Sequence, residues 1–225
     1  MGLLPRLGAI AFILVIAQPA HAATYNPGEG IPPGAPFQIY LDSDLHGQYR
    51  AEMAARENKG VGRQCLAAVT VGDATVTIIN PVTMVETNRY PTKGLWIERY
   101  EATACGRTRT FNTLFEMQDG GGMTVTPVVP GSSERAFDLL QGLRPYIEEN
   151  TLIDGCTIKS VLDTNPGLPN GYNAAVMDGD YDTWRVIGCG KQFDVVLLFT
   201  SAPDGTIDIT IEQQIAVNPA APAKP

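Results

Sequence analysis

The chain has 225 residues and a formal net charge of -8 at pH 7. This acidic balance disfavours nucleic acid and anionic lipid surfaces as partners, because both repel a negatively charged protein. The hydrophobic fraction of 44% is that of a folded protein and excludes a chain that is disordered throughout.

The N-terminus has the pattern of a secretory signal peptide. A short basic start ends at Arg6, an apolar run follows over residues 7–17, and Ala20-His21-Ala22 forms a small-x-small cleavage site. The apolar run is shorter than the roughly 20 residues that a membrane-spanning helix needs, and no later segment is apolar over that length. We therefore expect residues 1–22 to be removed and the mature protein to be periplasmic or secreted, without a membrane span.

Proline and glycine are concentrated at both ends of the mature chain. Residues 23–37 are therefore predicted to be a disordered lead-in, and residues 218–225 a disordered tail. Between these ends the sequence predicts two structured units, over residues 38–130 and 131–217.

The first unit begins with a helical pattern. A helix is predicted over residues 43–58, because apolar residues recur there at helical spacing and Gly60 follows the end. Ser43 or Asp44 is placed to accept the free amide groups of the first turn. The Gly72-Asp73 pair is predicted to be a hairpin loop. Alternating, β-favouring residues predict the strands of this unit over residues 66–71, 74–79, 96–104, 111–117 and 123–125.

The second unit repeats the change from helix to strands. Its helix is predicted to begin at residues 132–133 and to stop or kink at Pro145. The strand over residues 193–199 is apolar at consecutive positions, so we expect it to be buried on both faces. Residues 207–211 alternate between isoleucine and polar residues, which predicts a half-buried strand. The longest loops, rich in Pro, Gly and Asn, are predicted over residues 88–94 and 165–180.

The two units resemble each other in the order of their motifs. "TACGRTRTFNTLF" from Thr103 and "IGCGKQFDVVLLF" from Ile187 both place Cys-Gly before a basic residue and a strand, and an Asp-Gly turn follows each. Tyr100 and Trp184 lie five positions before the two cysteines. We therefore predict an α+β fold with two similar helix-plus-antiparallel-strand units, pseudo-symmetric and disulfide-stapled.

Four cysteines lie in the mature part of the chain: Cys65, Cys105, Cys156 and Cys189. An even number in an exported protein predicts two disulfide bonds. One bond in each unit would pair Cys65 with Cys105 and Cys156 with Cys189, while pairings between the units stay open. Zinc bound by the four thiolates is the alternative, although no two cysteines have CxxC spacing.

The sequence predicts neither a catalytic constellation nor a cofactor. His46 is the only histidine left after signal removal, and its place near a helix start suggests a surface residue. No GxSxG or SxxK motif is present. The remaining enzymatic alternative is a small hydrolase that uses carboxylates or His46.

Two further sets of residues could bind ligands. Asp178, Asp180 and Asp182 alternate like the first ligands of a calcium loop, but the later Gly and Glu of an EF-hand are missing. A solvated polar turn is the competing interpretation. The other set is aromatic and could line a carbohydrate or peptide groove, or else fill a core: Trp96, Tyr100 and Trp184.

The sequence thus predicts an exported, non-enzymatic binding or interaction protein of the bacterial cell envelope. Its partner would be an unknown protein, peptide or glycan. The alternatives are the small secreted hydrolase and an enzyme inhibitor that presents the loop of residues 166–180.

Overall fold

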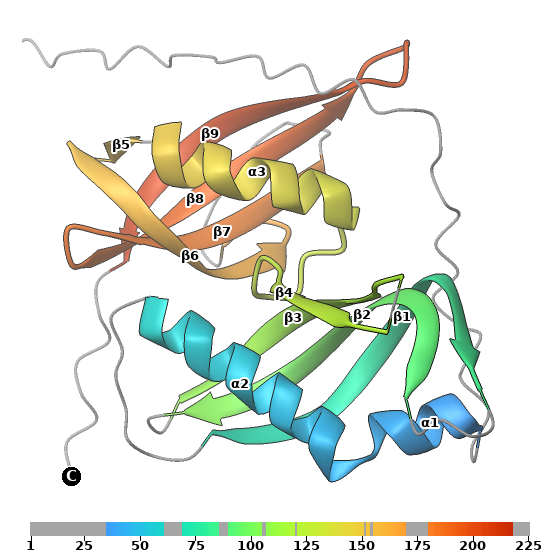
Figure 1. The fold of residues 1–225 in the computed structure, drawn as a ribbon. Coiled ribbons are helices and arrows are strands. Elements are labelled where there is room, and N and C mark those ends of the chain that lie inside the picture. Colours follow the sequence, from blue (N-terminus) through green and yellow to red (C-terminus); the bar gives the residue numbers. More distant parts are fainter. Residues whose placement is uncertain are drawn as a thin grey trace, which may run out of the picture.

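The structure is a computed structural model, and it contains mostly β-structure. Among the described residues, nine strands form two antiparallel sheets, and three helices accompany them. Figure 1 shows the two sheets one above the other, with a long helix across each. The described residues are 35–60, 69–85, 90–104, 107–119, 121–150, 152–153, 155–169 and 180–217. The predicted signal peptide, nearly all of the lead-in and the tail lie outside them. No helix among them combines the length and the apolar character needed to cross a membrane.

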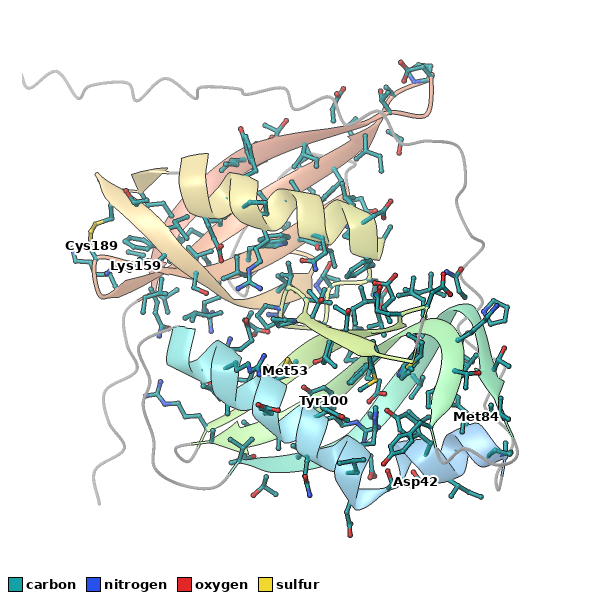
Figure 2. The ribbon with its side chains drawn as sticks, viewed as in Figure 1. Asp42, Met53, Met84, Tyr100, Lys159 and Cys189 are labelled. Atoms are coloured by element: carbon teal, nitrogen blue, oxygen red, sulfur yellow. A yellow bond between two sulfur atoms is a disulfide. The ribbon has the colours of Figure 1, made fainter. Side chains whose placement is uncertain are left out.

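The first sheet is a four-stranded meander with the order β1-β2-β3-β4. Its strands are β1 (Thr70–Met84), β2 (Pro91–Ala104), β3 (Arg107–Met117) and β4 (Met123–Pro127). Helices α1 (Pro36–Leu41) and α2 (Asp44–Gly60) pack on one face of it. From Trp96 to Ala104, every second residue of β2 is buried, and Figure 2 shows Tyr100 on the sheet side of α2. Trp96 and Phe115 stack there with parallel rings, 5.4 Å between centroids.

The second sheet has five strands in the order β5-β6-β7-β8-β9. They are β5 (Leu152–Ile153), β6 (Cys156–Pro166), β7 (Asp180–Gly188), β8 (Lys191–Ser201) and β9 (Ile207–Val217). Helix α3 (Phe137–Asn150) covers one face and buries Leu143 against Trp184 and its neighbours in the largest apolar cluster. Val195 and Val196, successive residues of β8, are both 0% exposed, which confirms the predicted burial on both faces.

The predicted α+β class, with two helix-plus-antiparallel-strand units, is wrong. The protein is mainly β, because strand pairing extends well beyond the segments where side chains alternate. Backbone groups can pair irrespective of side chain, so residues 91–94 and 165–166, predicted as loops, lie in β2 and β6.

The predicted hairpin loop at Gly72-Asp73 is also wrong. Strand β1 continues through this pair, and its register against β2 shifts between Val71 and Ala74. Gly72 and Asp73 together stand opposite a single residue of β2, which is a β-bulge in this edge strand. The chain continues through the bulge without a turn.

The helices agree with the sequence in part. Helix α2 was predicted with its N-cap, and the Ser43 hydroxyl does accept the backbone N–H of His46 at 3.3 Å. Helix α1 was missed, and Phe37, which we assigned to the lead-in, is buried in the core. Helix α3 begins at Phe137 and not at residues 132–133, and it continues through Pro145 to Asn150.

One Cys-Gly pair forms a tight hairpin turn. Cys189 (φ 48°) and Gly190 (φ 75°) connect Gly188 to Lys191, and two positive φ angles are the mark of a type I′ turn. The Cys156–Cys189 disulfide, with Cα atoms 5.6 Å apart, ties this turn to the start of β6 and confirms one predicted pairing (Figure 2).

The other Cys-Gly pair lies outside the described residues, as does Cys65, so the second pairing stays a prediction. The hairpin of β2 and β3 nevertheless has the same register, because Ala104 pairs with Arg107 around two intervening residues. The duplication of the sequence itself remains a prediction.

Residues 128–133 join the two sheets, and we call this segment the junction. On one side, the N–H of Gly131 donates to the carbonyl of Thr110 in β3 at 3.0 Å. On the other side, the N–H of Ser132 donates to the carbonyl of Thr164 in β6 at 2.6 Å. The junction is therefore hydrogen-bonded to both sheets, which explains why α3 does not begin there.

Candidate functional site

A buried charged cluster links α2 to the first sheet. His46 Nε2 lies 2.6 Å from Glu98 Oε1, and Arg50 Nε lies 2.5 Å from Glu98 Oε2. Trp96 Nε1 also donates to Glu98 Oε1 at 2.7 Å. His46 and Glu98 both have 0% of their side chains exposed. The interpretation of His46 as a surface residue is therefore wrong, since a carboxylate from β2 accompanies it into the core.

The environment of Glu98 keeps its carboxyl group ionised. Burial alone would raise the pKa of Glu98, but the hydrogen bond from His46 and the charge of Arg50 hold that pKa below its ordinary value. The Arg50 backbone is fixed in turn, because the hydroxyl of Tyr100 donates to its carbonyl oxygen at 3.0 Å. Burial raises the pKa of Tyr100 to about 12, so its hydroxyl stays protonated.

A histidine next to a carboxylate is also the arrangement of a catalytic base. In this cluster, however, the rings of Tyr40 and Phe115 lie 4.6 and 4.8 Å from the His46 ring and cover it. His46 Nδ1 is buried without a hydrogen-bond partner among the described residues. A general base must reach the proton of a substrate, and this imidazole cannot. The cluster therefore fastens α2 to the sheet.

A second charged cluster surrounds the N-terminal side of α3. Arg135 binds both Asp180 and Asp182, and its Nε lies 3.2 Å from Asp182 Oδ1. The hydroxyl of Ser133 donates to Asp182 Oδ2 at 2.5 Å. Two of the three predicted calcium ligands thus hold a guanidinium group, and the third, Asp178, lies outside the described residues. Within the described part of the chain, no group of three acidic, His or Cys side chains could hold a metal ion.

The buried carboxyl of Asp182 gives a prediction for pH dependence. Burial raises its pKa, although Ser133 and Arg135 bind it. An acid whose folded pKa is raised stabilises the fold at low pH and loses that contribution as the pH rises through the folded pKa. We therefore expect Asp182→Asn to become more favourable, relative to wild type, between pH 4 and pH 7.

Urea denaturation at both pH values would measure this difference. Asp204→Asn is the matched control of opposite sign, because hydrogen bonds from Thr206 lower the pKa of Asp204. Its stability relative to wild type should fall as the pH rises toward the unfolded pKa of about 4, and should change little from there to pH 7. A change of the same sign in both variants would contradict the assignment.

The predicted aromatic ligand-binding residues lie in the two cores. Trp96 and Trp184 are 0% exposed and Tyr100 is 2% exposed. They pack against α1, α2 and α3 and cannot stack on a ligand at the surface. The loop of the inhibitor hypothesis, residues 166–180, lies mostly outside the described residues.

A polar groove of about 400 Å³ lies where the two sheets meet. Residues of β2, β3, β6, β7 and β8 line it, and among the described lining residues Leu162 alone is apolar. Three arginines contribute to its wall: Arg107, Arg109 and Arg185. The same lining also carries two carboxylates, Glu101 and Asp163, and Arg185 is paired with Asp194.

Two of these arginines are held rigidly. Arg185 makes a bidentate pair with Asp194, with N–O distances of 2.8 and 3.0 Å. Arg109 donates to the side chain of Asn58 at 3.2 Å and to the carbonyl of Leu162, and its guanidinium lies over the Phe111 ring. Because its partners come from α2 and β6, Arg109 ties the wall of the groove on β3 to both of these elements.

Four other groups in the groove are uncommitted. The side chains of Arg107, Glu101, Thr110 and Gln192 make no hydrogen bond or ion pair within the part of the chain that the structure describes. Arg107 and Glu101 are exposed, and the other two are half-buried. The groove thus offers one cation, one anion, one amide and one hydroxyl to a ligand.

Comparison with protein-family models, with curated proteins and with solved structures finds no match to this chain. The assignment of the site therefore depends on the geometry of the molecule.

Sequence reasoning missed both the buried cluster and the groove. The cluster had a signal: Glu98 alternates with Trp96 and Tyr100 on the buried face of a strand, and His46 and Arg50 are four residues apart on one helix face. A carboxylate on such a face needs a cationic partner. The groove had no comparable signal, because five strands from both sheets contribute to it.

Proposed function

We propose that the mature protein is an exported, non-enzymatic binding protein of the bacterial cell envelope, and that the groove between the sheets is its ligand site. The observation that carries this proposal is the set of uncommitted polar side chains in a concave surface. Polar groups that converge in a concave surface can fix the orientation of a ligand and provide specificity.

The construction of the groove favours binding. Arg109 and Arg185 are already fixed by partners in the protein, so a ligand would not have to order them. Preorganised groups lose less conformational entropy on binding. The Cys156–Cys189 disulfide is compatible with an oxidising compartment outside the cytoplasm.

The burial of His46 argues against the alternative hydrolase. His46 and Glu98 are the one histidine–carboxylate pair of the described residues, and both are inaccessible to a substrate. The groove contains carboxylates, but Asp163 there accepts the backbone N–H of Thr164 and the amide of Asn165, both at 3.1 Å. Glu101 is therefore the one acid of the described lining whose carboxylate has no partner there, whereas glycoside hydrolysis uses a pair of carboxyl groups across the scissile bond.

The proposal predicts that groove charge controls retention by the envelope. Purified mature protein would be incubated with the envelope fraction of its native cell and sedimented. Arg107→Glu should lower the bound fraction about tenfold, because it places a repulsive charge in the groove and removes a charge-assisted hydrogen bond.

Lys93→Glu is the matched control. It makes a similar change of charge at an exposed position near the start of β2, whereas Arg107 of β3 pairs with the last residue of β2. The control should bind like wild type. Equal retention of wild type and Arg107→Glu would show that the groove is not the binding site.

A further inference from the structure

We propose that the ligand of the groove is an acidic saccharide, whose carboxylate is bound by Arg107 and whose hydroxyl groups are bound by Glu101, Thr110 and Gln192. This inference rests on the proposed function and names the chemical class of its ligand.

The carboxylate follows from the unpaired cation. Arg107 is exposed, lines the groove and has no ion-pair or hydrogen-bond partner among the described residues. A guanidinium group matches a carboxylate with two parallel hydrogen bonds. The net negative charge of the chain does not oppose this, since charges beyond about 8 Å are screened at physiological ionic strength.

The hydroxyl groups follow from the remaining side chains. Glu101 can only accept hydrogen bonds when ionised, Thr110 can donate and accept, and Gln192 has both an amide donor and a carbonyl acceptor. Hydroxyl groups of a sugar can satisfy all three, because each both donates and accepts. A simple dicarboxylate, ionised at neutral pH, offers Glu101 no hydrogen-bond donor.

The lining of the groove disfavours a peptide that is recognised through apolar side chains. Such recognition uses apolar pockets or aromatic-lined grooves. Leu162 is the single apolar residue in the described part of the lining, and Trp96 and Trp184 are buried elsewhere. The volume of about 400 Å³ is near the lower end of the range for small-molecule sites, roughly 300–1,000 Å³, which suits a short oligosaccharide segment.

The test uses two trisaccharides that differ only in charge. Isothermal titration calorimetry of the mature protein would compare trigalacturonic acid with its methyl ester, which keeps the ring hydroxyls and removes the negative charges. The acid should bind wild type about tenfold more tightly than the ester does.

Two variants assign the roles of the side chains. Arg107→Gln should reduce the preference for the acid to within about twofold, while leaving the affinity for the ester nearly unchanged. Glu101→Gln should weaken binding of the ester, because a charged acceptor for a ring hydroxyl is lost, and should weaken binding of the acid less, because the repulsion between carboxylates is lost as well. Both positions are exposed, so thermal melts of these variants should match wild type.

Three outcomes would overturn the inference. They are equal affinity of acid and ester for wild type, a full preference for the acid in Arg107→Gln, and tighter binding of a triglutamate peptide than of trigalacturonic acid. If neither saccharide binds while envelope retention still depends on Arg107, the ligand class is wrong and the proposed function stands. If retention does not depend on Arg107, the proposed function itself is wrong.

Discussion

Substituting valine for Gly131 should lower the free energy of unfolding by more than about 4 kcal/mol, which is exceptional for a single residue. Gly131 has a φ of +111°, and a Cβ atom there would lie 2.1 Å from the backbone nitrogen of Thr164 and 2.3 Å from its carbonyl oxygen. Neither atom can move aside easily, because that carbonyl accepts a hydrogen bond from Ser132. A side chain at this position would therefore force the junction away from β6.

Chemical denaturation of the mature protein would measure this loss. Gly142→Ala is the control, since Gly142 lies exposed in α3 and a Cβ atom added there would have no heavy atom within 4 Å. Alanine should stabilise that helix by about 0.5–1 kcal/mol. Wild-type stability of Gly131→Val would contradict the close contact between the junction and β6.

Replacing Glu98 by alanine should cost about 3–5 kcal/mol, because it leaves the cationic side of a buried ion pair without its partner. Arg50 would lose its carboxylate, and Trp96 would lose the acceptor of its indole N–H. Glu101→Ala is the control on the same strand. Glu101 is exposed, so that change should alter stability by no more than about 0.5 kcal/mol.

Glu98 should also make the free energy of unfolding depend on pH. The pKa of Glu98 is lowered in the folded protein, so its contribution is present above the unfolded pKa of about 4.3 and is lost as the pH falls through the folded value. Wild type should therefore lose its advantage over Glu98→Gln in acid. A difference that does not change with pH would contradict an ionised Glu98.

Elements with a strong local sequence pattern were predicted correctly. Features that depend on contacts between distant parts of the chain were not. Helix α2 and the strand β8 have strong periodicity over many residues, and both were predicted. Helix α1 is only six residues long and follows a Pro- and Gly-rich segment, so its buried face depends on Trp96 far along the chain. Gly72-Asp73 has turn-forming residues, but pairing with β2 decides that β1 continues.

The candidate site was beyond local patterns for the same reason. His46 is 52 residues from Glu98 in the sequence, and the two side chains meet because α2 packs on the sheet. The sequence shows a basic residue after each Cys-Gly pair, but it does not show that the neighbours of Arg107 in the groove come from both sheets. Arg107 becomes part of a groove only because the junction is hydrogen-bonded to both β3 and β6.

Nuclear magnetic resonance mapping would test the central claim, that the groove between the sheets is the ligand site. Trigalacturonic acid would be titrated into the ¹⁵N-labelled mature protein, and the backbone amide shifts would be followed. We expect the largest changes at the residues that line the groove on both sheets, which are 101, 107–110, 162, 163, 165, 185 and 192. Changes concentrated elsewhere, such as around α1, would contradict the account.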